Sequence, residues 1–212
     1  MRLIFASALL SVLALAGDQA GLVILYDVDN AYSSGAFADM RSELAGIMQK
    51  TGLEIDWHAK PSDSFPPTAA QIVIIRFRGH CTMDGLMTTH DHDSGALAVT
   101  HIVNGEVLPF SDVNCDLVRA NVRAAMLGFD RQRADLFRGR ALGRVVAHEL
   151  WHILSKSTSH GRHGVTKKCL SPQQLVADRI EVLEEDLQRL VDAGSDAHGD
   201  PSAHIGNSGS QF

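Results

Sequence analysis

The succession of apolar patterns along this 212-residue sequence predicts an α+β fold, in which a mixed twisted sheet packs against helices. Three observations support this class. A strand-like run, a helical run and further strand-like runs fill the first half of the chain. After residue 114 the apolar residues recur at helical spacing, which predicts a helix carrying the candidate functional residues and a C-terminal helix. No repeat or change of composition divides the chain, so we expect one domain over residues 21–192.

Residues 1–20 are expected to be a signal peptide and not part of the fold. Arg2 provides a positive start, and residues 3–16 form an apolar run without charge. Small residues at the end of this segment offer sites for cleavage. The run is too short to span a bilayer comfortably. We therefore expect a secreted or periplasmic protein, and we expect residues 193–212, which lack periodicity, to form a disordered tail.

The first elements of the sheet follow from the spacing of apolar residues. Residues 22–26 form a continuous apolar run, which is typical of a buried strand. A helix is expected to begin at residues 33–35, because apolar residues then recur every three or four positions, and Gly52 ends it. Residues 53–57 alternate between apolar and polar side chains, which predicts a strand with one covered face. Residues 71–78 predict a third strand.

A β-hairpin is expected next. Residues 96–103 and 106–110 are its two strands, and Asn104-Gly105 between them is a strong signal for a tight hairpin turn. Beyond the hairpin the pattern becomes helical, from Asn114 onward.

Two further helices are expected after that change of pattern. One covers residues 142–154. The other begins at Pro172, a residue favoured in the first turn, and its apolar stripe continues to Leu190.

Composition excludes some classes of function. Apolar residues make up 45% of the chain and charged residues 21%, which is typical of a soluble globular protein. The net charge is −6 and no basic block offsets it, so a nucleic-acid surface is not indicated. Eleven histidines are unusual for this length, and such enrichment makes metal binding a hypothesis worth testing against their spacing.

Three cysteines allow one disulfide within the chain. Cys81 follows a strand-like run and Cys115 starts a helix, so we favour a bridge between them that ties the sheet to that helix. Cys169 is then the unpaired cysteine. A zinc site made of two cysteines and a histidine is the competing interpretation, but no CxxC spacing supports it.

The candidate functional site is the segment His148-Glu149-Leu150-Trp151-His152, inside an apolar helical stretch. Four-residue spacing puts both imidazoles on one helix face, one turn apart, where their nitrogens can converge on one ion. Zinc suits imidazole ligands and needs only a third protein ligand to leave a position for water. Glu149 is placed to accept a proton from that water. Burying these polar side chains without such a partner is costly.

The third ligand is expected from the loop that follows this helix, residues 155–164. Glycines in the loop permit a tight turn that folds the chain back beneath the helix. His160 is the first candidate for the third ligand and His163 is the second.

The segment resembles the HExxH motif of the zincin metallopeptidases, and a third histidine soon after it resembles the metzincin branch, whose longer motif is HExxHxxGxxH. The first five positions match. Ser155 and Thr158 then stand where the metzincin glycine and third histidine would be, and His160 comes two residues later. The methionine of the metzincin Met-turn has no counterpart, because Val165 or Thr166 stands in that part of the sequence.

This resemblance covers about residues 145–166 and implies a metzincin-like zincin fold. It implies a zinc ion held by His148, His152 and His160, and hydrolysis of peptide bonds with Glu149 as general base. It also implies that the strand at residues 96–103 pairs with an extended peptide substrate.

Other arrangements stay open at this point. In the gluzincin branch a glutamate of a later helix is the third ligand, a position that Glu181, Glu184 or Glu185 could fill, although a solvated acidic face is the simpler interpretation. The acidic and histidine-rich loop at residues 89–93 is a further candidate for a second metal or calcium, but it lacks the ligand spacing of a calcium loop, and a solvated loop is the simpler interpretation. His101 is either a partly exposed sheet residue or part of a substrate cleft.

The sequence thus predicts an exported zinc-dependent metallohydrolase that acts on peptides or proteins. The alternative is an exported domain that binds zinc without catalysis, or that acts through protein contacts. A purely structural zinc site closes its coordination sphere and needs no neighbouring base. The presence of Glu149 therefore favours catalysis.

Overall fold

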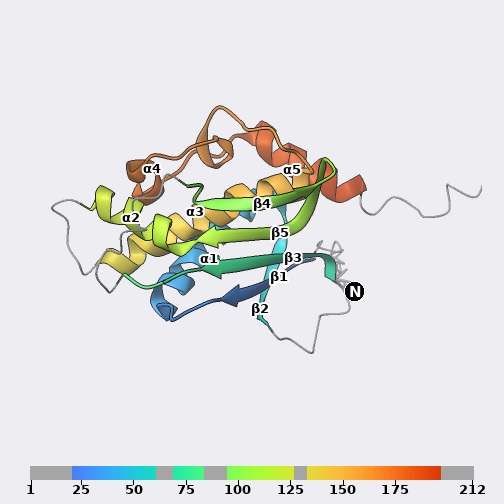
Figure 1. The fold of residues 1–212 in the computed structure, drawn as a ribbon. Coiled ribbons are helices and arrows are strands. Elements are labelled where there is room, and N and C mark those ends of the chain that lie inside the picture. Colours follow the sequence, from blue (N-terminus) through green and yellow to red (C-terminus); the bar gives the residue numbers. More distant parts are fainter. Residues whose placement is uncertain (1–20, 61–68, 84–94, 127–132, 197–212) are drawn as a thin grey trace, which may run out of the picture.

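The computed structural model describes residues 21–60, 69–83, 95–126 and 133–196 of the chain (Figure 1). The expected signal peptide, residues 1–20, and the loop at residues 89–93 lie outside the described residues. The described elements, in chain order, are β1 (Gly21–Val28), α1 (Ser34–Met48), the 3-10 helix η1 (Gln49–Thr51), β2 (Glu54–Ala59), β3 (Ala69–Arg78), β4 (Ala98–Val103), β5 (Glu106–Asn114), α2 (Cys115–Ala125), α3 (Ala134–Ser155), the 3-10 helix η4 (Gly164–Thr166), α4 (Pro172–Val176) and α5 (Glu184–Asp196).

The strands form one five-stranded mixed sheet, which confirms the predicted α+β class. Their order is β2-β1-β3-β5-β4. Four of them run parallel, and β4 pairs antiparallel with β5 at one edge. Figure 1 shows α1 and α3 together behind the sheet. Side chains alternate between the two faces of the sheet in β3, where Val73, Ile75 and Phe77 are fully buried towards the helices and Ile72 is 41% exposed.

The predicted start of the first helix and the predicted hairpin turn are confirmed. The side chain of Ser33 accepts a hydrogen bond from the backbone N–H of Ala36 and caps α1, and Gly52 ends the following turn in the left-handed conformation. At the hairpin, Asn104 and Gly105 both have positive φ, 53° and 84°, as a type I′ turn requires. The returning strand is longer than expected, since β5 continues to Asn114.

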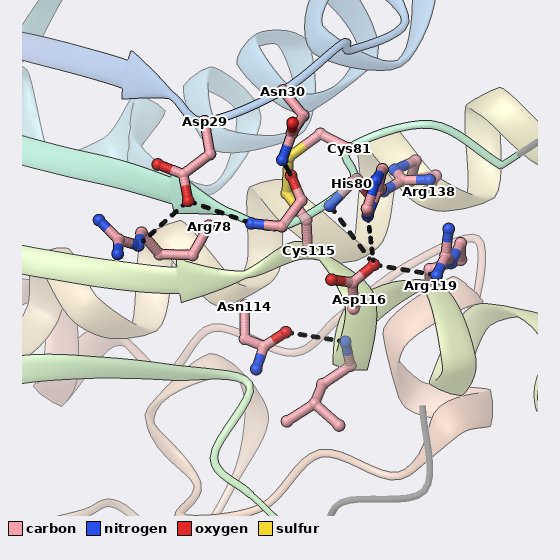
Figure 2. The surroundings of a disulfide bond; sticks show 12 residues. Asp29, Asn30, Arg78, His80, Cys81, Asn114, Cys115, Asp116, Arg119 and Arg138 are labelled. Carbon is pink, nitrogen blue, oxygen red and sulfur yellow. Dashed lines mark hydrogen bonds and ion pairs between the residues drawn. A yellow bond between two sulfur atoms is a disulfide. The ribbon is translucent and has the colours of Figure 1, made fainter. Parts of the chain in front are cut away.

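The disulfide joins Cys81 and Cys115, as predicted (Figure 2). Cys169 is free and exposed. The disulfide connects the chain just beyond β3 to the first residue of α2. Around it, Asp116 accepts a hydrogen bond from the backbone N–H of His80 and pairs with Arg119. This arrangement excludes a zinc site built on two cysteines of the chain, because the two buried sulfurs are bonded to each other.

Helix α3 begins before the expected range, residues 142–154. Its first turns carry charged residues among the apolar ones, so no continuous apolar stripe marks them in the sequence. Arg138 and Arg144 of this helix are fully buried. Arg144 donates to the carboxylate of Glu43 on α1 at 2.7 Å. A side chain at Gly143 would meet the backbone and side chains of α1, so glycine lets the two helices approach closely. Arg138 lies in the part of α3 that was not predicted, whereas Gly143 and Arg144 lie inside the expected range.

The prediction of a single C-terminal helix from Pro172 to Leu190 is wrong. The chain forms two helices, α4 and α5, with a non-helical segment between them. Ala177 ends α4 in an extended conformation, with ψ at 151°. Arg144 donates to the carbonyls of Gln174 and Ala177, at 2.5 and 2.7 Å, and so occupies acceptors that a continuing helix would use itself.

Helix α5 extends beyond the expected end of the domain at residue 192. Helix α5 continues to Asp196, four residues into the segment expected to be a tail, and residues 197–212 lie outside the described part. Within the described ranges, no helix combines the length and the apolar character needed to cross a bilayer.

Candidate metal centre

The C-terminal half of α3 carries the three predicted site residues in one helical turn. Glu149 and His152 are 5% and 8% exposed, and His148 is half-buried. Trp151, on the same turn, is buried in the core. The prediction that this segment is helical, with both imidazoles on one face, is confirmed: the ring centroids of His148 and His152 lie 4.8 Å apart.

Backbone carbonyls fix the orientation of both rings. The Nδ1 atom of His148 lies 2.6 Å from the carbonyl oxygen of Val165, and that of His152 lies 2.6 Å from the carbonyl oxygen of Ser157. A carbonyl oxygen only accepts, so each Nδ1 carries the proton and donates it. In the neutral rings each Nε2 therefore presents a lone pair.

The two Nε2 lone pairs face each other across 3.1 Å. Without a proton or a cation to share, two acceptors at this distance repel. Two nitrogens at ordinary zinc–nitrogen distances on a tetrahedral ion stand roughly 3.3 Å apart. The separation of the two Nε2 atoms of His148 and His152 therefore fits a shared metal ion.

His160 completes a cluster of three imidazoles. Its ring centroid lies 5.3 Å from that of His148 and 4.8 Å from that of His152. One nitrogen of each ring lies within 4.8 Å of the others. Among the described residues, this is the one group of three or more potential ligands close enough to hold a metal ion. Three imidazoles are the donor set of an open zinc site, with room for one more ligand.

The other candidate ligands lie elsewhere. His163 is 59% exposed and its Nδ1 lies 3.9 Å from the carboxylate of Glu181, which is also exposed. Glu184 forms a salt bridge with Lys50, and Glu185 is exposed. None of them belongs to the histidine cluster, so the structure favours His160 among the third ligands that the sequence left open.

The path of the chain after α3 explains how His160 returns to the helix. Lys156 takes the left-handed conformation, with φ at 51°, and ends the helix so that the carbonyl of Ser157 turns back to His152. The chain closes into a loop where Gly161 donates to the carbonyl of Thr166 at 2.9 Å. The hydroxyl of Thr166 bonds in turn to the buried carboxylate of Asp186 on α5 at 2.7 Å.

Burial favours the metal-binding form of two of the rings, those of His148 and His160. Burial lowers the pKa of His148, helped by the neighbouring His152 and opposed by the hydrogen bond to Val165. Burial also lowers the pKa of His160, and the charges of His152 and His148 act in the same direction. Since a metal binds only the unprotonated nitrogen, these shifts favour metal binding near neutral pH.

Glu149 lies beside the cluster and does not belong to it. Its Oε2 atom accepts a hydrogen bond of 2.6 Å from the hydroxyl of Thr100 on β4. Burial raises the pKa of Glu149, and the bond from Thr100 opposes that rise. A carboxylate that is buried, anchored and next to the candidate metal site is suited to exchange protons with a bound molecule.

A cleft gives access to both parts of the site. It runs between β4 and α3, and one of its hollows has a volume of about 390 Å³. His148 and Glu149 line it together with residues of the segment that follows the helix. His101 lies on the other side of the strand, where its Nε2 is 2.7 Å from the carboxylate of Asp112, so it does not line this cleft.

Three supporting features were not predicted from the sequence. They are the carbonyl of Val165 beneath His148, the bond between Thr166 and Asp186, and the contact of Thr100 with Glu149. The first is a backbone atom and carries no sequence signal. The other two join residues distant in the chain, and only the tertiary fold brings them together.

We expect Gly164→Ala to weaken metal binding without touching a ligand. Gly164 has φ at +56°, and a Cβ there would collide with the carbonyl oxygen of Glu181. The backbone must shift, and it carries the carbonyl of Val165 that orients His148. Loss of such an orienting partner costs about 10- to 100-fold in metal affinity. Chelator competition measures the change, and Gly52→Ala, at another positive φ far from the cluster, should leave the affinity unchanged.

Comparison of the chain with models of known protein families, with curated proteins and with solved structures gave no match. No family is therefore assigned to the chain. The histidine cluster, Glu149 and the cleft are the features of the molecule that bear on its function.

Proposed function

We propose that this protein is an exported zinc-dependent metallohydrolase that cleaves peptide bonds. The observation that carries the proposal is the convergence of two Nε2 lone pairs at 3.1 Å, beside a buried carboxylate and in residues that line a cleft. His148, His152 and His160 would hold the ion.

The proposed roles follow from the chemistry of each group. Bound zinc supplies a Lewis acid that polarises a carbonyl and lowers the pKa of water. Glu149 accepts the proton of the attacking water and delivers it to the leaving amine. The hydrogen bonds from His148 and His152 to backbone carbonyls fix the tautomer and the orientation of each ring.

A peptide is the substrate class that the cleft supports best. Strand β4 is at the edge of the sheet and borders the cleft, and one side of it pairs with β5. An extended peptide could add to its other side through backbone hydrogen bonds. Val99, Ile102 and Val103 on this strand are about half exposed, which offers apolar contacts to substrate side chains.

The proposal includes a distant relationship to the metzincin-like zincins. Support comes from the HExxH helix, from the third histidine in the loop after it, and from an antiparallel edge strand beside that helix. The proposed export from the cytoplasm is supported by the N-terminal sequence and by the disulfide, since disulfides persist in oxidising compartments.

Metal analysis and a cleavage assay test the proposal together. We expect one zinc ion per chain in the purified protein, and cleavage of a mixed library of quenched-fluorescence peptides. A chelator should abolish cleavage, and added zinc should restore it. A protein that holds no zinc would contradict the metal site. Zinc without any cleavage would contradict catalysis and favour the non-catalytic zinc-binding alternative.

A further inference from the structure

The carboxylate of Glu149 is anchored by the sheet as well as carried by its own helix. Thr100, on β4, places its hydroxyl 2.6 Å from Oε2 of Glu149. The same hydroxyl lies 2.6 Å from the hydroxyl of Ser111 on β5. Thr100 and Ser111 are directly opposite each other in the antiparallel register, and Ser111 is fully buried. Three side chains from two strands and a helix thus form one hydrogen-bonded chain.

The direction of the hydrogen bonds among Ser111, Thr100 and Glu149 follows from the donors available. An ionised carboxylate only accepts, so the hydroxyl of Thr100 donates its single proton to Glu149. The contact between Thr100 and Ser111 must then be made by the proton of Ser111. Each hydroxyl is oriented by the next, and the series ends on the carboxylate. A bond to an ionised acceptor is stronger than one between neutral groups.

We propose that Thr100, oriented by Ser111, is a positioning residue that holds Glu149 in place to act on bound water. This inference rests on the proposed function. A glutamate side chain has several rotatable bonds, and a catalytic group has to stay within about 0.5 Å of its productive position. With Oε2 fixed by Thr100, the other carboxylate oxygen is the one that takes the proton.

The placement of Thr100 also links the base to the proposed substrate strand. Thr100 belongs to the edge strand, and its side chain points to α3 while its neighbour His101 points to the opposite face of the sheet. A peptide paired with β4 would therefore lie against the strand that anchors Glu149. The strand that carries Thr100 would then set the separation between the scissile bond and the base.

Two substitutions at Thr100 separate a hydroxyl role from a packing role. Thr100→Val keeps the shape and loses the hydroxyl, whereas Thr100→Ser keeps the hydroxyl and loses a methyl group. We expect kcat to fall about 10- to 100-fold in the valine variant, with KM and zinc content unchanged. The serine variant should recover most of kcat. A role in packing predicts the reverse order, and that order, or full kcat in the valine variant, would overturn the inference.

A second measurement does not depend on hydrolysis. In the zinc-free protein, Thr100→Val should lower the melting temperature by about 4–8 °C, because a buried carboxylate loses a charge-assisted hydrogen bond. In a Glu149→Leu background the same change should cost at most about 2 °C. Equal shifts in both backgrounds would show that Thr100 does not hold Glu149. If the wild type cleaves nothing, the proposed function fails, and this cycle still decides whether the contact exists.

Discussion

Glu149→Gln is expected to remove most of the hydrolytic activity while the protein keeps its zinc. The amide has the shape of the carboxylate but cannot accept the proton of the attacking water. General acid–base catalysis contributes about 10²- to 10⁴-fold to such reactions, and kcat should fall by that factor. Zinc content should not change, because Glu149 lies outside the cluster of His148, His152 and His160.

The measurement pairs kcat on the best peptide of the library with metal analysis of the same preparation. Glu54→Gln is a suitable control, since Glu54 is an exposed carboxylate on β2, at the edge of the sheet opposite to β4. It removes the same charge and should leave kcat and zinc content unaltered. Equal activity of Glu149→Gln and wild type would remove the catalytic role of Glu149. Loss of zinc in that variant would instead make Glu149 part of the metal site.

Features encoded by local sequence were predictable in this chain. The first strand, the cap of α1 at Ser33 and the turn at Asn104-Gly105 each depend on a few adjacent residues. The helical spacing of His148 and His152 is local in the same sense. Their convergence could therefore be predicted before any tertiary contact was known.

Features that depend on distant partners were not predictable. Arg144 looks like a surface residue in the sequence, but it is buried because Glu43 and two backbone carbonyls, 30 or more residues away, satisfy its guanidinium. Those contacts also divide the expected last helix into α4 and α5. The anchor of Glu149 is similar, since Thr100 is 49 residues away in the chain. A hydrophobic pattern contains no information on such pairs.

The choice of third ligand depends partly on local sequence and partly on the tertiary fold. The sequence offers His160 and His163 in one short loop, and spacing alone ranks them only weakly. What separates them is the conformation of Lys156 and the closure of the loop between Gly161 and Thr166, which turn the ring of His160 to the cluster. His163 is left beside Glu181 at the surface.

His160→Ala is therefore expected to remove zinc binding, and His163→Ala is expected to preserve it. Loss of a residue that only orients a ligand costs about 10- to 100-fold in metal affinity, so loss of a ligand should cost more than about 100-fold. Competition against a chelator of known affinity measures both variants. The two changes are closely matched, because each replaces a histidine of the same loop by alanine. If His163→Ala were the variant that lost zinc, the loop would have to rearrange on binding the metal. If both retained it, two histidines of α3 would suffice, and the proposed three-histidine site would be wrong.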